Sequence, residues 1–292
     1  MKHVLDIDDL SAEEIETLYE LTDQIKADPG AFDDSLANES LVMLFAKPST
    51  RTRISFESGM TELGGHAIYF SKEHSQIARG ESLRDTATVL SRYAGGIMAR
   101  LFDHETLLEL ADGADGPVIN GLTNKLHPCQ ALADGYTLRE NGLDDGPLAY
   151  IGDGNNVAHS LMQLCATLDI PCRIGTPDGF EPDQEIQDRV AGADVMVTND
   201  PVKAVAGARA VYTDVFVSMG DDESKRSAFE GFQVTPELMA ETDDAAFMHC
   251  LPAHRGEEVS AAVMDGENSI VYDQAENRKH VQKAILQTVY ET

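Results

Sequence analysis

The sequence has few basic residues and no apolar run approaching the length of a membrane span. Lys and Arg total 22 against 51 Asp and Glu, so the 292-residue chain carries a formal net charge of −29. Nucleic-acid binding is therefore excluded as a main activity, because no basic patch could offset that field. A membrane-spanning helix would need about 20 consecutive apolar residues. The first residues also lack an apolar signal core, so we expect a cytoplasmic protein.

Cysteine is scarce as well. The four cysteines are Cys129, Cys165, Cys172 and Cys250, and no two of them form a Cys-x-x-Cys pair. In a chain this long, their spacing argues against both a disulfide framework and a structural zinc site. We therefore expect free thiols and no metal.

The acidic excess is spread along the chain and is not confined to a tail. A disordered acidic protein would explain the charge, but the regular apolar periodicity and the 42% hydrophobic content favour folded cores. Adaptation to high salt is a better explanation, since the Debye length falls to about 3 Å at molar salt and like charges no longer repel one another over long distances. The scarcity of Lys, with 9 residues against 13 Arg, also suits a halophilic protein.

Short apolar runs alternate with amphipathic stretches along the whole chain. This alternation predicts an α/β fold of two domains, each with a central, mostly parallel sheet flanked by helices. The turn-rich segment 141–147 predicts the boundary, which gives domains at residues 1–142 and 143–274 and a last helix at about 275–292. The runs expected to form strands are 41–46, 67–70, 97–101, 118–120, 148–151, 171–175, 195–198, 210–215, 246–250 and 270–272.

Residues 47–53 (Lys-Pro-Ser-Thr-Arg-Thr-Arg) place three hydroxyls and two guanidiniums within five positions. They separate an apolar run from a stretch with Phe56, Met60 and Leu63 at helical spacing, so we expect a strand, a turn and a helix start. A helix start offers unpaired N–H groups and the positive end of its dipole to a phosphate, and Arg adds charge-assisted hydrogen bonds. A Ser/Thr cap beside solvated arginines would use only one hydroxyl, so we favour an anion site.

A second turn lies at residues 151–156 (Ile-Gly-Asp-Gly-Asn-Asn), between an expected strand and an expected helix. It lacks the third glycine of the dinucleotide fingerprint G-x-G-x-x-G, so it is weak support for a dehydrogenase. A turn that exposes an Asn amide to a ligand and a plain turn both fit this segment.

Four further side chains stand at strand ends or helix starts. His127 precedes a helix that begins with Pro128 and could donate to a carbonyl oxygen, although a lone His is more often structural. Asp214 suits an ammonium ligand or a helix cap. Cys250 could be a nucleophile, but a small buried thiol is the commoner case. Arg278 falls in the first turn of the last helix, where a cation is unfavourable, so an anionic partner or a surface ion pair would explain it.

Taken in chain order, from Ser49 to Arg278, these motifs resemble the aspartate/ornithine carbamoyltransferase family. The Ser-Thr-Arg-Thr-Arg run is similar to its carbamoyl-phosphate signature, and His-Pro-x-Gln, Gly-Asp-Gly-Asn-Asn, Asp-x-x-x-Ser-Met-Gly and His-Cys-Leu-Pro follow at family spacing. The last two motifs look like those of the ornithine-specific members, since aspartate-specific members carry a basic loop. The resemblance implies carbamoyl transfer from carbamoyl phosphate to the side-chain amine of L-ornithine, giving citrulline and phosphate, or the reverse reaction in arginine breakdown, without a cofactor.

The resemblance also implies that the first domain binds carbamoyl phosphate, that the second binds ornithine, and that the last helix returns to the first domain. Carbamoyl phosphate would be held by Ser49, Thr50, Arg51, Thr52, Gln76, Arg100, His127, Gln130, Cys250, Leu251 and Arg278. Ornithine would be held by Asn156, Asp214, Ser218 and Met219. The catalytic residues would be Arg100, His127, Cys250 and Arg278.

In this family Gln76 comes from a neighbouring subunit and the catalytic unit is a trimer, so we expect a trimer or a multiple of one. One departure is Cys129, which replaces the usual Thr of His-Pro-Thr-Gln and would weaken any hydrogen bond made by that hydroxyl. Other interpretations remain open. They are carbamoyl transfer to aspartate, putrescine or an acylated ornithine, a dinucleotide-binding dehydrogenase, and a non-catalytic acidic interaction protein.

Overall fold

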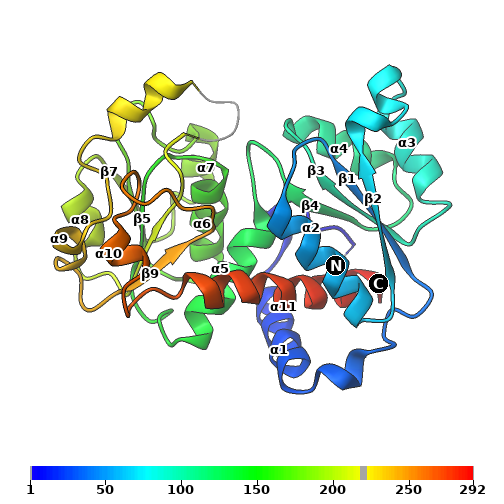
Figure 1. Ribbon diagram of the computed structural model, residues 1–292, viewed down its shortest axis with the longest axis horizontal. Coiled ribbons are helices and arrows are strands. Elements are labelled where there is room, and N and C mark those ends of the chain that lie inside the picture. The colour runs from blue at the N-terminus through cyan, green and yellow to red at the C-terminus, as the bar shows by residue number, and fades with distance from the viewer. Residues whose placement is uncertain (1, 218–221, 292) are drawn as a thin grey trace. The chain divides into compact units, whose positions relative to one another are not determined.

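The computed structural model describes residues 2–217 and 222–291 (Figure 1). The chain divides into two compact units, Met1–Ala133 with Arg278–Thr292 as unit 1 and Asp134–Asn277 as unit 2. The first division falls inside helix α5 (Pro128–Glu140), whereas the sequence placed the boundary in the turn that follows this helix.

Unit 1 is built on a parallel sheet with the strand order β2-β1-β3-β4. The strands are β1 (Ser40–Phe45), β2 (His66–Ser71), β3 (Gly96–Arg100) and β4 (Val118–Leu122). The inner strands β1 and β3 are almost fully buried, as is typical of parallel strands covered on both faces, whereas the edge strand β2 is largely exposed. The chain reverses its direction of winding between β1 and β3, so a ligand is expected at the carboxyl ends of these two strands.

Helices connect the strands of unit 1 (Figure 1). They are α1 (Ala12–Ala27), α2 (Thr50–Glu62), α3 (Leu83–Leu90) and α4 (His104–Gly113), with 3-10 turns η1 (Ile7–Asp9), η2 (Pro29–Phe32), η3 (Lys72–His74) and η4 (Ile77–Arg79). α1 begins at a capping box, in which Ser11 and Glu14 each accept the other's backbone N–H. α2 buries Phe56 and Met60, so the strand, turn and helix expected around residues 47–53 are present.

The last helix, α11 (Val271–Tyr290), begins four residues earlier than residue 275, where the sequence placed its start. The predicted strand at 270–272 was therefore wrong. The neighbouring Ser269 forms a single parallel bridge with Phe247, and the Ile270 carbonyl already accepts a helical hydrogen bond from the backbone N–H of Gln274 at 2.9 Å. An apolar run of three residues carries too little pattern to distinguish a strand from a buried helix start.

The C-terminal part of α11 packs onto unit 1, as the resemblance implied. Lys283 is nearly fully buried and its Nζ lies 3.1 Å from Oε2 of Glu62 on α2. Near the end of the helix, the Tyr290 hydroxyl donates to the carbonyl oxygen of Ser40 at 2.7 Å. These contacts tie α11 both to α2 and to the first residue of β1.

Unit 2 contains a second parallel sheet, with the strand order β7-β6-β5-β8-β9. Its strands are β5 (Leu148–Ile151), β6 (Cys172–Gly175), β7 (Val195–Thr198), β8 (Ala210–Thr213) and β9 (Ala246–His249). Its helices are α6 (Asn156–Thr167), α7 (Gln184–Arg189), α8 (Pro201–Val205), α9 (Pro236–Met239) and α10 (Ala261–Met264), with a 3-10 segment η5 (Glu223–Phe229). The direction of winding reverses between β5 and β8, which marks their carboxyl ends as this sheet's expected ligand site.

An aromatic cluster anchors the segments that follow β8. The ring of Phe216 stacks on Phe229 with 4.6 Å between centroids, and Phe180 lies 5.0 Å from Phe229. All three belong to the hydrophobic core of unit 2 or pack against it. None of the helices in the described part of the chain combines the length and the apolar character that crossing a membrane requires.

Candidate active site

In unit 1, candidate residues gather where β1 ends and α2 begins. Ser49 caps α2, since its Oγ accepts the backbone N–H of Thr52 at 3.3 Å. The side chain of Thr52 is fully buried, and its Oγ1 accepts a hydrogen bond from Nη2 of Arg278 at 2.9 Å. The hydroxyl-rich turn therefore receives a guanidinium from the C-terminal helix, which a simple capped helix would not need.

The predicted first-turn position of Arg278 was wrong, because α11 begins at Val271 and places this residue in the helix interior. The helix dipole therefore does not explain Arg278. The side chain is only 4% exposed, and a buried guanidinium is stabilised by hydrogen bonds and by nearby negative charge. Its contact with Thr52 puts that positive charge beside the first turn of α2.

Two more predicted residues lie close to Arg278. Arg100 ends β3 and pairs in register with Phe45 at the end of β1. His127 stands directly before α5 and is 5% exposed. Burial lowers the pKa of His127 well below its usual value, and the positive charges of Arg278 and Arg100 lower it further. His127 is therefore a neutral imidazole at neutral pH and can donate one N–H to a carbonyl oxygen without carrying charge.

The first turn of α5 also contains Gln130 and Cys129, both almost completely buried. The Cys129 thiol donates to the backbone carbonyl of Asn120, on β4, with 3.4 Å between Sγ and the oxygen. Burial raises the pKa of Cys129 to about 12, so the thiol stays protonated at neutral pH. Cys129 thus bonds to the backbone of the sheet, a contact that a Thr hydroxyl at this position could also make.

The structure places the other predicted donor-site residues as follows. Thr50 and Arg51 form the first turn of α2, with Arg51 half-buried and Thr50 exposed. Gln76 is exposed directly before η4, and among the described residues no hydrogen bond links its side chain to this group. Thr52, Arg100, His127 and Arg278 are thus brought together within unit 1, while Gln76 lies on the surface.

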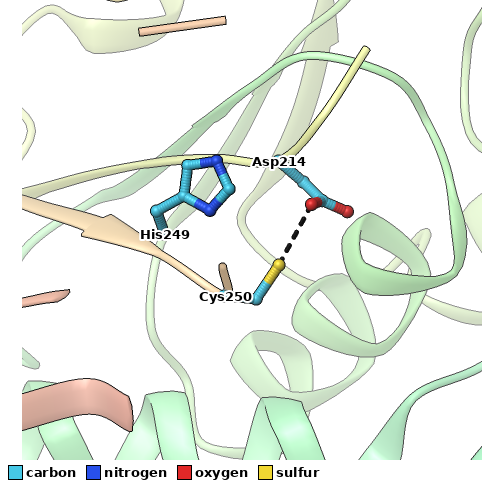
Figure 2. A group of neighbouring side chains, drawn as sticks. All are labelled: Asp214, His249 and Cys250. Carbon is cyan, nitrogen blue, oxygen red and sulfur yellow. Dashed lines mark hydrogen bonds between the residues drawn. The ribbon is translucent and has the colours of Figure 1, made fainter. Parts of the chain in front are cut away.

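A separate group of candidate residues in unit 2 lies where β8 and β9 end. Asp214 directly follows β8 and Cys250 directly follows its neighbour β9. The thiol of Cys250 donates to Oδ1 of Asp214, with 3.0 Å between sulfur and oxygen (Figure 2). The same oxygen accepts the backbone N–H of Val215 at 2.8 Å, and Oδ2 accepts Nδ2 of Asn155 at 3.0 Å. Both carboxylate oxygens are therefore held in place.

The Cys250 thiol is not poised as a nucleophile. Burial raises its pKa well above the usual value, and the negative charge of Asp214 and the hydrogen bond to it raise it further. The thiolate is the reactive form of cysteine, so a covalent mechanism through Cys250 is disfavoured. As a protonated donor, Cys250 instead helps to orient the carboxylate of Asp214.

A buried His–Glu pair supports the end of β9. Nδ1 of His249 accepts the backbone N–H of Leu251 at 2.8 Å, so the ring proton is on Nε2, which lies 3.2 Å from Oε1 of Glu258. His249 and Glu258 are both fully buried. Leu251 adopts a left-handed backbone with φ of 59°, which is unfavourable for a residue with a Cβ. This pair therefore fixes the backbone that presents Cys250 and Leu251.

The described residues include one group at this site with the donor types of a metal centre. Atoms of Asp214, His249 and Cys250 that could bind a metal lie within 4.8 Å of one another (Figure 2). However, both nitrogens of His249 already take part in the hydrogen bonds to Leu251 and Glu258. The geometry is therefore that of a hydrogen-bonded support for the strand end, and we assign no metal to it.

The glycine turn after β5 does not have the form of a dinucleotide site. A Cβ at Gly154 would lie 2.2 Å from the backbone nitrogen of Pro182 and 2.6 Å from the carbonyl oxygen of Phe180. This glycine is thus needed for the close approach of the 180–182 segment, and not for a pyrophosphate. The turn leads into α6, where Asn155 is the N-cap residue and Asn156 the first helical residue. Ser218 and Met219, the remaining predicted ornithine residues, lie outside the described residues.

Comparison with known proteins identifies a family for both units. The family described as aspartate/ornithine carbamoyltransferase matches with its carbamoyl-P binding domain at residues 2–140 and its Asp/Orn binding domain at residues 144–289. The chain belongs to the aspartate/ornithine carbamoyltransferase family. Residues 2–133 of unit 1 thus fall within the carbamoyl-P binding domain of the family, whereas residues 278–289 of unit 1 fall within the Asp/Orn binding domain.

Several relatives and solved structures of the family cover nearly the whole chain. A catabolic ornithine carbamoyltransferase of Halobacterium salinarum is 60% identical over 293 residues, which is 99% of each chain. An ornithine carbamoyltransferase of Archaeoglobus fulgidus is 46% identical over 98% of this chain and 96% of its own. The solved ornithine carbamoyltransferase of Pyrococcus furiosus is 45% identical, with a TM-score of 0.94 over 99% of this chain and 97% of its own.

The sequence did not point to three residues that hold the unit 2 group in place. Asn155 bonds Asp214, and Glu258 bonds His249. Gln274 accepts the backbone N–H of His249 at 2.8 Å, and its own amide donates to Asp134 at 2.7 Å. Only Asn155 carried a signal in the sequence, since it stands two positions before Val157, the first residue of an apolar helical stripe, where an N-cap is expected.

Proposed function

We propose that this chain transfers the carbamoyl group of carbamoyl phosphate to the side-chain amine of L-ornithine, giving L-citrulline and phosphate, or runs the same reaction in reverse in arginine breakdown. The observation that carries the proposal is the opposite charge of the two sites. In unit 1, buried Arg278 contacts the start of α2 and, with the half-buried Arg100, acts on His127, and in unit 2 the oriented carboxylate of Asp214 stands at a strand end. The first arrangement suits a phosphate and the second suits an ammonium group.

On the donor side, Ser49, Thr50, Arg51 and Thr52 hold the phosphate of carbamoyl phosphate, and Arg100 contacts both ends of the molecule. His127 and Gln130 hold the carbamoyl group, and Arg278 points its charge at the carbonyl oxygen. Support for these roles comes from the contact of Arg278 with Thr52 and from the positive charges of Arg278 and Arg100, which act on the buried His127 and add to the lowering of its pKa by burial.

On the acceptor side, Asp214 and Asn156 hold the amino-acid end of ornithine, together with Ser218 and Met219. Cys250 and Leu251 line the position of the side-chain amine and the carbamoyl group. Asp214 argues against aspartate as the acceptor, because the second carboxylate of aspartate would meet a carboxylate that is already held in place. Repulsion between these two carboxylates would weaken the binding of aspartate. Such repulsion selects against a wrong substrate, just as attractive contacts select for the right one.

The reaction follows from these residue types. The neutral amine attacks the carbamoyl carbon, negative charge develops on the carbonyl oxygen, and phosphate leaves with the electron pair of the broken C–O bond. Arg100, Arg278 and the N–H of His127 stabilise that developing charge, an effect usually worth about 3–4 kcal/mol for each donor. The free ammonium group has a pKa near 10.4, so the acceptor must lose a proton before it attacks. Once the new C–N bond has formed, the attacking nitrogen is positively charged and must lose a further proton, and we propose that departing phosphate accepts this second proton.

We further propose that the enzyme is cytoplasmic, works at high salt, and assembles as a trimer or a multiple of one. The salt requirement is supported by the net charge of −29. The assembly is supported by the exposure of Gln76, which in this proposal completes the site of a neighbouring subunit. The proposed domains are residues 1–142 with the C-terminal helix for carbamoyl phosphate, and residues 143–274 for ornithine.

An acceptor panel tests the function. Carbamoyl phosphate is supplied with L-ornithine, L-aspartate or putrescine at low and at molar KCl, and the carbamoylated product is identified. The proposal expects citrulline from ornithine alone, with far higher activity in molar KCl. Full citrulline formation at low salt would support the proposed activity and contradict the proposed salt requirement. Product from aspartate or putrescine, with none from ornithine, would overturn the assignment of the acceptor.

A further inference from the structure

The side chain of Asn155 makes hydrogen bonds in two directions. Its Oδ1 accepts the backbone N–H groups of Val157 and Ala158 at 2.9 and 3.3 Å, which caps α6. Because two N–H donors define the oxygen, the amide nitrogen must face the other way, where Nδ2 donates to Oδ2 of Asp214 at 3.0 Å. The orientation of this amide is therefore determined by the contacts themselves.

A buried tyrosine holds the same amide from the side of the sheet. The hydroxyl of Tyr150, on β5, lies 3.3 Å from Oδ1 of Asn155 and donates to it. Burial raises the pKa of Tyr150 well above its usual value, so the hydroxyl keeps its proton at neutral pH. The ring stacks on Tyr212 of β8 with 5.8 Å between centroids. Asn155 is thus fixed to the sheet as well as to α6.

Capping alone does not require asparagine at this position. Other helices of the chain begin with Ser49, Asp103, Asp200 or Ser260, and all of these side chains accept a backbone N–H. Ser, Asp and Asn cap about equally well. Among them, only Asn carries its acceptor and its donor on two separate atoms, so that one can cap the helix while the other reaches a neighbouring carboxylate.

The hydrogen-bond donors around Asp214 occupy all but one of the acceptor positions of its carboxylate. A carboxylate has about four lone-pair positions. In the described part of the chain, Oδ1 accepts from Cys250 and Val215 and Oδ2 accepts from Asn155. The fourth position, on Oδ2, is therefore the one available to a ligand, and Asn155 sets where it points.

We propose that Asn155 is a positioning residue for the acceptor: it couples the N-terminus of α6 to Asp214 and aims the Oδ2 atom that receives the ammonium group of the amino-acid substrate. This inference rests on the proposed function and deepens it. Asn155 touches neither the carbamoyl group nor the reacting amine, so it acts only through Asp214. Its loss should therefore weaken acceptor binding and leave carbamoyl-phosphate binding unchanged.

Two variants separate this role from capping. Asn155→Ser keeps a cap acceptor, but its hydroxyl ends one bond nearer the backbone than Nδ2 and does not reach Asp214. Asn155→Asp keeps the size and the cap acceptor while facing Asp214 with a second carboxylate. We expect the KM for L-ornithine to rise at least tenfold in both, more in Asn155→Asp, with the KM for carbamoyl phosphate within twofold of the parent and thermal unfolding at nearly the same temperature. The matched control is Asp200→Ser, a cap of α8 with the same two backbone contacts, which should leave both KM values unchanged.

The result that would overturn the inference is an ornithine KM within twofold of the parent in both folded variants. A parallel rise of both KM values with a lowered unfolding temperature would also overturn it, since that pattern indicates a structural role alone. Failure of the parent enzyme to make citrulline is a different outcome, which would overturn the proposed function itself. If Asn155→Ser does not fold, Asn155→Asp decides the question, because it retains both the cap and the volume of asparagine.

Discussion

Units 1 and 2 share one arrangement of strands and a capped helix, but the charged side chains at their strand ends have opposite sign. In each, a parallel sheet reverses its winding, one strand leads into a capped helix, and the next strand over ends in a charged side chain. Unit 1 uses β1, the Ser49 cap and Arg100, and unit 2 uses β5, the Asn155 cap and Asp214. The backbone plan is shared, so the sign of each site is set by a few side chains at the strand ends.

The cap residues of α2 and α6 differ in keeping with the opposite charges of the two sites. Ser49 accepts one backbone N–H of α2, and the nearby Thr52 receives a guanidinium, so positive charge accumulates at that helix start. Asn155 accepts two backbone N–H groups of α6 and donates to a carboxylate. The positive N-terminal end of α2 in unit 1 can therefore attract an anionic ligand, whereas that of α6 in unit 2 is linked through Asn155 to the carboxylate of Asp214.

The largest expected effect is on the cationic side. Replacing the buried guanidinium in Arg278→Met removes a donor to the developing oxyanion, so kcat for citrulline formation should fall about 10²–10³-fold. The control is Arg84→Met, since Arg84 forms an exposed pair with Asp112 and should change kcat by less than twofold. Steady-state kinetics in molar KCl provides the measurement. A loss smaller than tenfold would mean that Arg278 serves packing and not the reaction.

The corresponding change on the anionic side is Asp214→Asn, which keeps the shape and removes the charge. A hydrogen bond to a charged group is worth about 1.5–3 kcal/mol, so the KM for ornithine should rise about 10- to 100-fold. The control Asp169→Asn removes one exposed carboxylate of the same unit, at a left-handed position that Asn accepts readily. Equal effects of the two substitutions would show that general charge, and not this site, controls ornithine binding.

A pH effect should distinguish the buried histidine of the cationic site. Burial beside two arginines lowers the pKa of His127 in the folded state. The free energy of unfolding is therefore unaffected by this residue's titration above about pH 6.5, the pKa of an unfolded histidine, and falls as the pH drops from there toward the folded pKa. Between these values the unfolded state binds one more proton, a slope of up to about 1.4 kcal/mol per pH unit. The free energy of unfolding of the parent should therefore fall more steeply from pH 6.5 to 5 than that of His127→Asn. The free energy of unfolding would be obtained from denaturant titrations at each pH. The same dependence of this free energy on pH in the parent and in His127→Asn would contradict the neutral state of His127.

The smallest effect is expected at Cys129, although it lies in the His-Pro-x-Gln motif. Its thiol donates to the Asn120 carbonyl, and a Thr hydroxyl can make the same bond. Cys129→Thr should therefore change the KM for carbamoyl phosphate by less than about threefold and leave the KM for ornithine unchanged. A tenfold change in either constant would place the thiol in contact with substrate.

Much of this arrangement could be predicted from the sequence, because its pattern is local. The hydroxyl- and Arg-rich turn stands between an apolar run and a helical stripe, which predicted the order strand, turn, helix. The structure adds that Ser49 is the cap residue of this helix. Asp214 and Cys250 directly follow their strands, and in a parallel sheet the strand ends share one edge. Their direct contact at 3.0 Å agrees with that placement.

The missed features depend on contacts between distant parts of the chain. Asn155 and Asp214 are 59 positions apart, and nothing in their local patterns records that they meet. The start of α11 was missed because Val271 and its neighbours form a short apolar run that suits either a strand or a buried helix turn. The wrong start then put Arg278 in a first helical turn, whereas its environment is set by burial against α2.

Binding of inorganic phosphate alone would test the division of charge between the two units most directly. Calorimetric titrations in molar KCl would compare the parent with Arg51→Met, in the first turn of α2, and with Asp214→Asn. We predict that Arg51→Met loses measurable phosphate binding and that Asp214→Asn binds phosphate with the affinity of the parent. Equal loss in both variants, or unchanged binding in Arg51→Met, would contradict the assignment of the anion site to unit 1 and the ammonium site to unit 2.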